Sequence, residues 1–490
     1  MLAWIGALSW LVLREYRPAT GAEYGASAEI QLPPTTTFYA LHAGADQVGF
    51  RSITTDTVPN GVRITSRIDV DVPLPLVPRR LLMTTETLYD ERFRLLGFTT
   101  TVSGEAGQQT LVATVEADSL LSVVISGRGQ TRPDTVVLQL PSGALLPDAV
   151  SIWLATGGKL KPGAVARVPV LDPVELTLSE WNMRVSAESV FVVADSAARD
   201  SATGAWIPAG LDTIQTVGAD WLEYGMPVRA WIDRQGSVIA RETPLGLTER
   251  RGPYEIVNSG YARRRPRNVQ AAPLEVPTPL GVATAPSRVS LGPVNLRSAA
   301  TMLTTPWQAA VGDQIESRYG PLLSPNAPLP LADSIRAGYS QSPTSAFIVS
   351  ETRRIAGADT ATHSRAVSRL AAWVGSAIVP GPPTVGDVER TLLLRRGDSS
   401  DRAALLVAMA RSLGIPARPV AGLLSTGGRL RYRAWAEVWL GVWLPVDPTL
   451  GQFPADPGHF RLLIDATARP STIVSLLGAV RPTLTNATAP

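Results

Sequence analysis

The sequence predicts an α+β protein, with a large antiparallel β-sheet domain at the N-terminus and an α+β domain at the C-terminus. Apolar and polar residues alternate in many short segments between residues 30 and 260, which is typical of antiparallel strands. Residues 261–330 are rich in proline and arginine and show little periodicity, so they predict a linker or an extended arm. Within residues 331–470, apolar residues recur first at helical spacing and then in alternation. Residues 1–17 form a short hydrophobic segment, and residues 471–490 are expected to be a flexible tail.

The composition is that of a folded protein without cysteine. Its 490 residues are 45% hydrophobic and 18% charged, which is enough apolar material for more than one core and excludes a disordered chain. The net charge is only +3, and basic residues do not interleave with aromatic ones, so nucleic acid is not an expected partner. Without cysteine there is neither a disulfide nor a thiolate nucleophile.

The first residues suggest contact with a membrane. Leu2–Leu13 is uncharged and apolar, and its two tryptophans, Trp4 and Trp10, would suit a membrane interface. Twelve helical residues span only about 18 Å against about 30 Å of hydrocarbon. Three interpretations stay open: the end of a membrane helix that starts upstream, a segment docked on a membrane or a partner, and an element buried in the fold. We favour the first two together, because no basic stretch or cleavage site marks a signal peptide.

The N-terminal β-domain is expected to open with a hairpin. Phe38–Leu41 and Gly44–Phe50 hold its two arms, and the alternation continues in segments 62–72, 98–102, 111–115, 121–125 and 136–140. Later strands are expected to carry several tryptophans, namely Trp153, Trp181, Trp206, Trp221 and Trp231. Such scattered tryptophans favour a place in the core, with an aromatic ligand-binding groove as the alternative.

A basic run opens the predicted linker. The sequence Arg-Arg-Arg-Pro-Arg at 263–267 could meet anionic lipid or an acidic partner, although a solvated run is the simpler interpretation. We therefore place the end of the β-domain at residue 260.

The region from Arg395 to Leu450 combines a capped helix with a hairpin. Residues 398–401, Asp-Ser-Ser-Asp, supply capping side chains and negative charge at the start of a helix that ends at Gly414. Residues 432–440 and 442–446 alternate as a hairpin around Gly441. An amphipathic helix precedes this region, with an apolar face formed by Val367, Leu370, Ala371, Val374 and Ile378. Together these patterns predict a helix packed on an antiparallel sheet.

Short motifs in a fixed order resemble the bacterial transglutaminase-like family, which has a papain-like fold. They are Gly397-Asp398-Ser399, the helix that follows, Gly-Ile-Pro-Ala-Arg at 414–418, Ala-Trp-Ala-Glu-Val-Trp at 434–439 and Trp-Leu-Pro-Val-Asp-Pro-Thr at 443–449. The opening hairpin is similar to that of an extracytoplasmic β-domain that precedes some of these bacterial domains. The resemblance therefore implies a periplasmic protein with a papain-like C-terminal domain.

The resemblance also locates a degenerate catalytic triad. In the family, cysteine stands at the position of Ser399 and histidine at that of Arg433, and an aspartate at the position of Asp447 completes a Cys-His-Asp triad. Only the aspartate remains here. A serine attacks only if a base takes its proton near neutral pH, and a guanidinium stays protonated. We therefore expect no catalytic residue: Ser399 is interpreted as a helix cap, and Arg433 as the ion-pair partner of Asp447.

No other residue is expected to restore catalysis. Of the three histidines, His42 lies in the N-terminal strand pattern and His363 begins the helix before the motif. His459 could lie near the cleft, where a hydrogen-bonded structural role is favoured over that of a relocated base. No cysteine, histidine pair or His-Glu spacing matches a metal site, so neither a metal nor a cofactor is expected.

These features favour a non-catalytic scaffold or accessory subunit that binds protein subunits at the periplasmic face of a membrane complex, such as an envelope or bioenergetic assembly. A papain-like cleft without its nucleophile still offers a groove for an extended peptide. Two alternatives stay open: a serine-based hydrolase or acyltransferase that uses Ser399 with an unseen base, and a sensor that binds a peptide or glycan in the vacant cleft.

Overall fold

The computed structural model describes residues 34–59, 61–71, 80–104, 107–116, 119–127, 133–243, 247–264, 287–290, 303–312, 314–320, 339, 345–357, 362–381, 388–426, 429–465 and 483–485. The hydrophobic segment 1–17 lies outside these ranges, as do most of the expected linker and tail. None of the helices within the ranges has the length and apolar character needed to cross a membrane. The membrane association expected for residues 1–17 stays a prediction.

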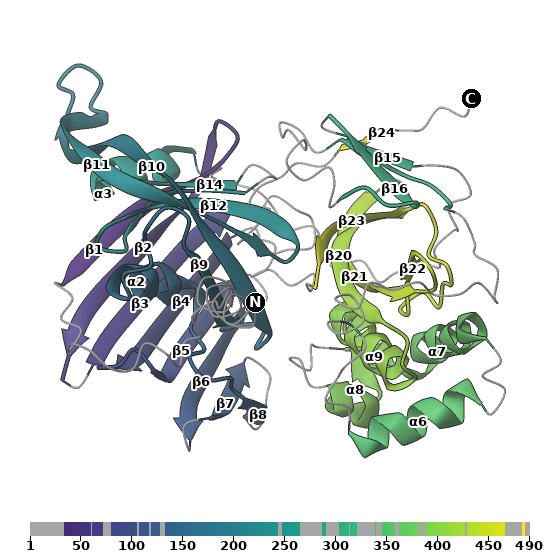
Figure 1. Ribbon diagram of the computed structural model, residues 1–490. Helices are drawn as coiled ribbons and strands as arrows, with labels where there is room; N and C mark the ends of the chain where they lie inside the picture. The colour runs from purple at the N-terminus through teal and green to yellow at the C-terminus, as the bar shows by residue number, and fades with distance from the viewer. Residues whose placement is uncertain are drawn as a thin grey trace, which may run out of the picture.

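The N-terminal domain is a 14-stranded antiparallel sheet, which Figure 1 shows as a strongly curved surface. Its strand order is β8-β7-β6-β5-β4-β3-β2-β1-β14-β13-β12-β11-β10-β9, so the first and last strands along the chain pair in the middle of the sheet. The strands are β1 (Thr35–Ala43), β2 (Asp46–Val58), β3 (Gly61–Asp71), β4 (Arg80–Asp90), β5 (Leu95–Gly104), β6 (Gly107–Glu116), β7 (Leu120–Gly127), β8 (Asp134–Gln139), β9 (Val165–Leu171), β10 (Leu178–Arg199), β11 (Trp206–Glu223), β12 (Met226–Asp233), β13 (Val238–Glu242) and β14 (Leu247–Gly252). The predicted large antiparallel sheet is confirmed.

The sequence patterns found most strands of the first half of this sheet but missed β4. Its inward positions include Thr85 and Thr87, which are buried although they are polar. Threonine weakens the apolar alternation while still favouring a strand through its branched Cβ. Thr85 finds a partner in Thr100 of β5, since their hydroxyl oxygens are 3.1 Å apart. The strand is therefore stable in the sheet although its hydrophobic signal is weak.

A short helical segment packs inside the curve of the sheet. It comprises η2 (Pro147–Ala149) and α2 (Val150–Thr156), with Trp153 and Leu154 buried. The expectation that Trp153 lies in a strand was wrong, because a short apolar run fits a buried helix as well as a strand. Just before it, Leu145 bridges to Val170 of the edge strand β9. The chain that leaves one edge strand, β8, thus returns to the other edge of the sheet.

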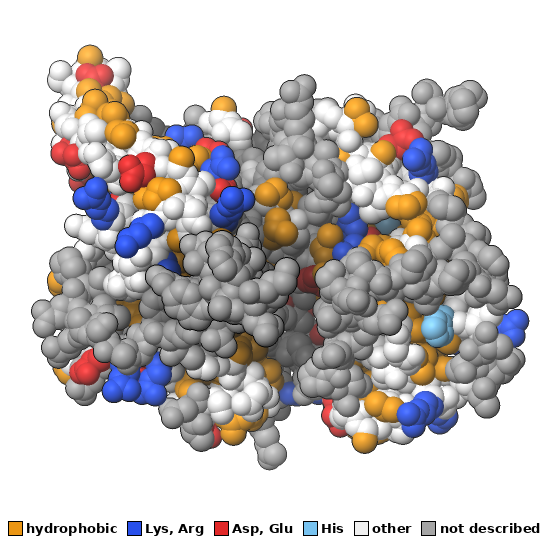
Figure 2. Space-filling model, in the orientation of Figure 1, with side chains coloured by type: hydrophobic (Ala, Val, Ile, Leu, Met, Phe, Trp, Pro, Cys, Tyr) orange, Lys and Arg blue, Asp and Glu red, His pale blue; other side chains and the backbone are white. Residues whose placement is uncertain are grey.

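Two long strands form an arm that projects from the sheet. β10 has 22 residues and β11 has 18, and their pairing continues to Arg199 and Trp206 at the far end. Figure 1 shows the arm extending beyond its neighbours, and Figure 2 shows hydrophobic side chains along it. After β14, α3 (Tyr254–Arg264) packs against β1 and β2. Arg263 and Arg264, the first two arginines of the basic run, therefore belong to a helix. This helix ends four residues past the domain boundary expected at residue 260.

The C-terminal domain packs helices against a four-stranded antiparallel sheet (Figure 1). The helices are α6 (Ala346–Ala356), α7 (His363–Ala377), α8 (Val388–Leu394) and α9 (Ser399–Ser412). The sheet order is β22-β21-β20-β23, formed by β20 (Ala417–Thr426), β21 (Arg429–Trp439), β22 (Trp443–Val446) and β23 (His459–Ile464), and the two-residue strands β18 (Val379–Pro380) and β19 (Arg396–Gly397) pair separately. The predicted apolar face of α7 and the buried apolar residues of α9 meet the sheet in one core. The expected α+β domain is confirmed.

A small sheet joins parts of the chain that the sequence assigned to linker and tail. Its order is β16-β17-β15-β24, formed by β15 (Ser287–Ser290), β16 (Gln308–Val311), β17 (Gln314–Ser317) and β24 (Thr483–Thr485). Gln308 ties this sheet to β23, since its side chain donates to the carbonyl of Arg461 (2.9 Å) and accepts from its N–H (2.7 Å). Pairings of three or four residues carry almost no periodic signal, so such strands are hard to find from sequence.

Candidate functional site

The start of α9 is fixed by Asp398 rather than by Ser399. The carboxylate of Asp398 accepts from the N–H of Asp401 (2.9 Å), and the carboxylate of Asp401 accepts from the N–H of Asp398 (3.0 Å). This reciprocal capping box satisfies helix donors that would otherwise lack partners. The interpretation of Ser399 as the helix cap was therefore wrong, because an aspartate one residue earlier already fills that role.

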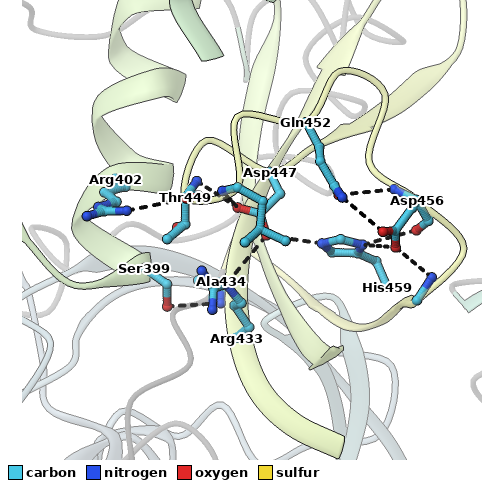
Figure 3. Close-up of polar contacts among 11 residues, drawn as sticks. Ser399, Arg402, Arg433, Ala434, Asp447, Thr449, Gln452, Asp456 and His459 are labelled. Carbon is cyan, nitrogen blue, oxygen red and sulfur yellow. Dashed lines mark hydrogen bonds and ion pairs between the residues drawn. The ribbon is translucent and has the colours of Figure 1, made fainter. Parts of the chain in front are cut away.

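Ser399 is the first residue of α9 and faces β21. Its Oγ accepts a hydrogen bond from the backbone N–H of Ala434 at 3.4 Å. Figure 3 places Ser399 beside Arg433 and Ala434, with Asp447 further in. The fold thus brings together Ser399, Arg433 and Asp447, as the resemblance implied. Within the described part of the chain, no imidazole or carboxylate is hydrogen-bonded to the Ser399 hydroxyl.

Asp447 is completely buried and is held by the backbone as well as by side chains. Its Oδ1 accepts from the N–H groups of Thr449 (2.7 Å) and Leu450 (3.2 Å), in the turn after β22. Its Oδ2 lies 3.4 Å from Nε of Arg433, so the expected ion pair is present. The Nε–H of Arg433 does not point at the carboxylate and has no hydrogen-bond partner among the residues that the structure describes. The pair is therefore mainly a charge interaction.

His459 supplies the closer contact to Asp447. Its Nε2 is 3.1 Å from Oδ2 of Asp447, and its Nδ1 lies 3.0 Å from the carbonyl oxygen of Asp456 and 3.3 Å from Oδ1 of that residue. Figure 3 shows the imidazole between the two aspartates. Trp435 packs edge-on against the ring at a centroid distance of 5.1 Å. Both ring nitrogens are thus engaged, and neither is left for Ser399.

Electrostatics make this histidine a cation. Burial would lower the pKa of His459, but hydrogen bonds and charge interactions with Asp447 and Asp456 outweigh it and raise the pKa to about 9. Burial raises the pKa of Asp447, yet the hydrogen bond from His459 and the charge of Arg433 hold it below its usual range. The pKa of Asp456 falls to about 2 for similar reasons: burial opposes ionisation, while His459 favours it more strongly. An imidazolium with these partners donates protons in hydrogen bonds and cannot act as a base near neutral pH.

The sequence predicted only part of the hydrogen-bonding arrangement around His459. A hydrogen-bonded structural histidine was the favoured interpretation, and the contacts agree with it. Asp456 was not recognised as a partner, although its spacing of three residues before His459 in a turn was a usable signal.

Arg402 adds a second buried guanidinium close to the site. Its side chain donates to the carbonyl of Thr449 at 3.5 Å, while its Nε has no hydrogen-bond partner within the described ranges. Burial and the neighbouring charge of Arg433 lower the pKa of Arg402. Together with Arg433 and His459 it surrounds Asp447 with positive charge, where catalysis would instead require a neutral base.

Behind the site, one buried carboxylate joins three strands. Glu437 of β21 binds Arg418 of β20 (2.7 Å) and Arg461 of β23 (3.0 Å). Burial raises the pKa of Glu437, but the two arginines outweigh it and hold the pKa below its usual range. The residues described also hold no group of three or more His, Asp or Glu side chains that could bind a metal ion.

Comparison with known proteins identifies the C-terminal domain. Residues 350–448 match the family model of the transglutaminase-like superfamily. No curated protein matches the chain. Three solved structures show distant similarity, none close enough to inform function.

A β-barrel-like protein of a domain of unknown function from Brucella abortus is 14% identical, with a TM-score of 0.32 over 46% of this chain and 96% of that chain. A candidate cysteine protease from Cytophaga hutchinsonii is 15% identical, with a TM-score of 0.26 over 42% of this chain and 84% of that chain. A protein of unknown function from Pseudomonas aeruginosa is 12% identical, with a TM-score of 0.23 over 45% of this chain and 95% of that chain. The family match and the observed α+β fold agree, and the chain therefore carries a transglutaminase-like domain at residues 350–448.

Proposed function

We propose that this chain is a non-catalytic scaffold or accessory subunit that binds protein partners at the periplasmic face of a membrane complex. The observation that carries the proposal is the state of His459. Both of its ring nitrogens are held by Asp447 and Asp456. To act as the base for Ser399, His459 would have to break one of these contacts. It would also have to lose its proton, although its pKa is raised to about 9.

Arg433 strengthens this conclusion from the other side. It occupies the position where the family carries its histidine, and it stays protonated at any physiological pH. Its positive charge also stabilises the ionised carboxylate of Asp447, which therefore stays paired inside the protein. These contacts therefore connect β21, the turn after β22 and β23 at the place where the family carries its catalytic residues.

The exposed arm of the β-domain favours a protein partner. Val190, Val192 and Leu211 are 62%, 64% and 68% exposed, and the register places Val190 and Val192 two residues apart on one strand, with Leu211 opposite Ala194 on the next. A projecting two-stranded ribbon with an apolar face offers both contact area and a regular shape to another subunit.

A serine-directed fluorophosphonate probe tests the absence of catalysis. We expect no labelling of the purified chain, and no change on Ser399→Ala. Labelling that disappears in Ser399→Ala and also in His459→Gln would instead establish the serine-based hydrolase, with His459 as its base.

Co-purification tests the scaffold. After gentle solubilisation of membranes, the chain should be recovered with other subunits at a fixed stoichiometry, and Ser399→Ala should leave that association intact. The double variant Val192→Asp with Leu211→Asp should reduce recovery of the partner at least tenfold. Val137→Asp, at a position 61% exposed on β8, is the matched control and should have no effect. A chain recovered alone as a monomer would refute the scaffold.

Saturable binding of a peptide or glycan that is lost on Gly397→Val would favour the sensor.

A further inference from the structure

One cavity of the N-terminal domain combines aromatic side chains with acidic ones. It has a volume of about 140 Å³ and lies between strands of the large sheet and the segment of η2 and α2, which packs inside the curve of the sheet (Figure 1). Trp181 of β10 and Trp221 of β11 stack at a centroid distance of 5.2 Å and line the cavity together with Met83 and Met183. The described residues that line it all belong to the N-terminal domain, so the cavity is separate from the cleft around Ser399.

A chain of ion pairs lines the same cavity. Arg51 pairs with Asp148 and with Glu249 (3.0 Å). Arg241 pairs with Glu249 (3.1 Å) and with Glu223 (2.5 Å). All five side chains are on the wall of the cavity. Because a carboxylate stands at each end of the chain, its carboxylates outnumber its guanidinium groups by one.

Asp172 adds a fourth carboxylate to the wall. Its Oδ1 accepts from the backbone N–H groups of residues 174 and 175, and its Oδ2 accepts from the hydroxyl of Tyr224 (2.9 Å). None of these donors carries a positive charge. The two arginines of the ion-pair chain are the only basic residues among the described residues that line the cavity. The wall therefore has two more carboxylates than guanidinium groups.

Glu223 has one carboxylate oxygen without a donor. Its Oε2 accepts from Arg241, whereas its Oε1 has no hydrogen bond within the described part of the chain. Oε1 does not belong to the unpartnered polar atoms that are sealed from solvent, so it keeps accessible surface. Since Glu223 is only 6% exposed and lines the cavity, we infer that this surface faces the cavity.

The environment of Glu223 opposes its negative charge. Burial raises the pKa of Glu223, and the positive charge of Arg241 lowers it only in part. The negative charges of Asp172 and Glu249 raise it further. A cation beside Oε1 would offset both the burial and the repulsion.

We propose that this cavity binds a small primary alkylammonium ion, whose ammonium group donates to Oε1 of Glu223 and whose apolar chain lies against Trp181 and Trp221. The ammonium group supplies both the donor that Glu223 lacks and positive charge for a wall with excess carboxylates. Tryptophan rings attract cations on their faces and pack against methylene groups at the same time. An apolar cavity of about 150 Å³ holds a ligand the size of benzene, so a chain of about four carbons fits.

Ligand-observed NMR titrations of the full-length protein near neutral pH test the choice of ligand. Butylammonium should bind saturably. Butan-1-ol and butyrate, which are of similar size but lack the positive charge, should bind more weakly by about tenfold or more. Absence of butylammonium binding, or binding of butan-1-ol as tight as that of butylammonium, would overturn the proposal.

Paired glutamate variants locate the site. Glu223→Gln removes the charge of the acceptor but keeps its size, so butylammonium should bind about tenfold more weakly. Glu242→Gln is the matched control, because Glu242 of β13 pairs with Arg250 (3.5 Å) away from the cavity and should leave binding unchanged. Equal affinities of these two variants for butylammonium would refute the role of Glu223.

A third variant tests the aromatic wall without touching the ion pairs, since Glu223→Gln also takes a partner from the buried Arg241. Trp181→Leu keeps every charged residue of the cavity but removes one ring of the stacked pair. Butylammonium should then bind about fivefold more weakly, as expected for the loss of one cation–π contact. Unchanged binding in Trp181→Leu would show that the ligand does not lie against the tryptophans and would overturn the proposal.

Discussion

The buried imidazole of His459 should make the C-terminal domain lose stability as the pH rises. In the folded protein the pKa of His459 is raised from 6.5 to about 9, with Asp447 and Asp456 as the causes that outweigh burial. A group whose folded pKa is raised contributes its full stabilisation below the unfolded pKa and loses it as the pH rises through the folded pKa. The affected window is therefore from about pH 6.5 to pH 9.

The size of the effect follows from the pKa shift. One unit corresponds to about 1.4 kcal/mol, so the free energy of unfolding should fall by roughly 3 kcal/mol across that window. The lowered pKa values of Asp447 and Asp456 describe the same contacts and add nothing to this figure. His459→Gln should abolish the slope. It should also cost about 3 to 5 kcal/mol near pH 6, because two buried carboxylates lose their shared cation.

Histidine-selective NMR gives a direct assay, because the chain has only three histidines. In protein labelled with ¹³C-histidine, the resonance that is absent from His459→Gln should titrate with a midpoint near pH 9. Urea denaturation followed on that resonance should show the falling stability. A midpoint below about 7, or a stability that is level between pH 6.5 and 9, would refute the assignment of His459 as a structural cation.

Two further substitutions test the sheet behind the site. Glu437→Gln leaves Arg418 and Arg461 buried without their shared carboxylate, so the free energy of unfolding measured by urea denaturation should fall by about 3 to 5 kcal/mol. A fall below about 1 kcal/mol would show that these two ion pairs are not coupled to the fold. Gly422→Ala should prevent ordered pairing of β20 with β23, because a Cβ at this position would overlap the carbonyl oxygen of Phe460; unchanged amide hydrogen exchange in both strands would contradict this.

The C-terminal fold was predictable because its signals are local. The capping side chains at residues 398–401, the helical spacing that ends at Gly414 and the alternation around Gly441 each specify an element within a few residues. Their order along the chain, together with the family resemblance, then predicted which elements pack together. The small sheet of β15, β16, β17 and β24 was not predictable in this way. Its strands pair over only three or four residues each, and β15 pairs with β24, which lies almost two hundred positions further along the chain.

The site shows the same division. By itself the sequence determined that the thiolate is missing, that an arginine stands where a base is needed, and that Asp447 survives, because these facts depend only on residue identity at motif positions. The structure decided which of the residues 398–401 caps α9, namely Asp398. Only the tertiary structure decided that His459 lies between two aspartates. Likewise, it alone stacked Trp181 on Trp221 on the wall of one cavity. Burial and hydrogen-bond partners set protonation and binding, and both arise only when distant segments meet.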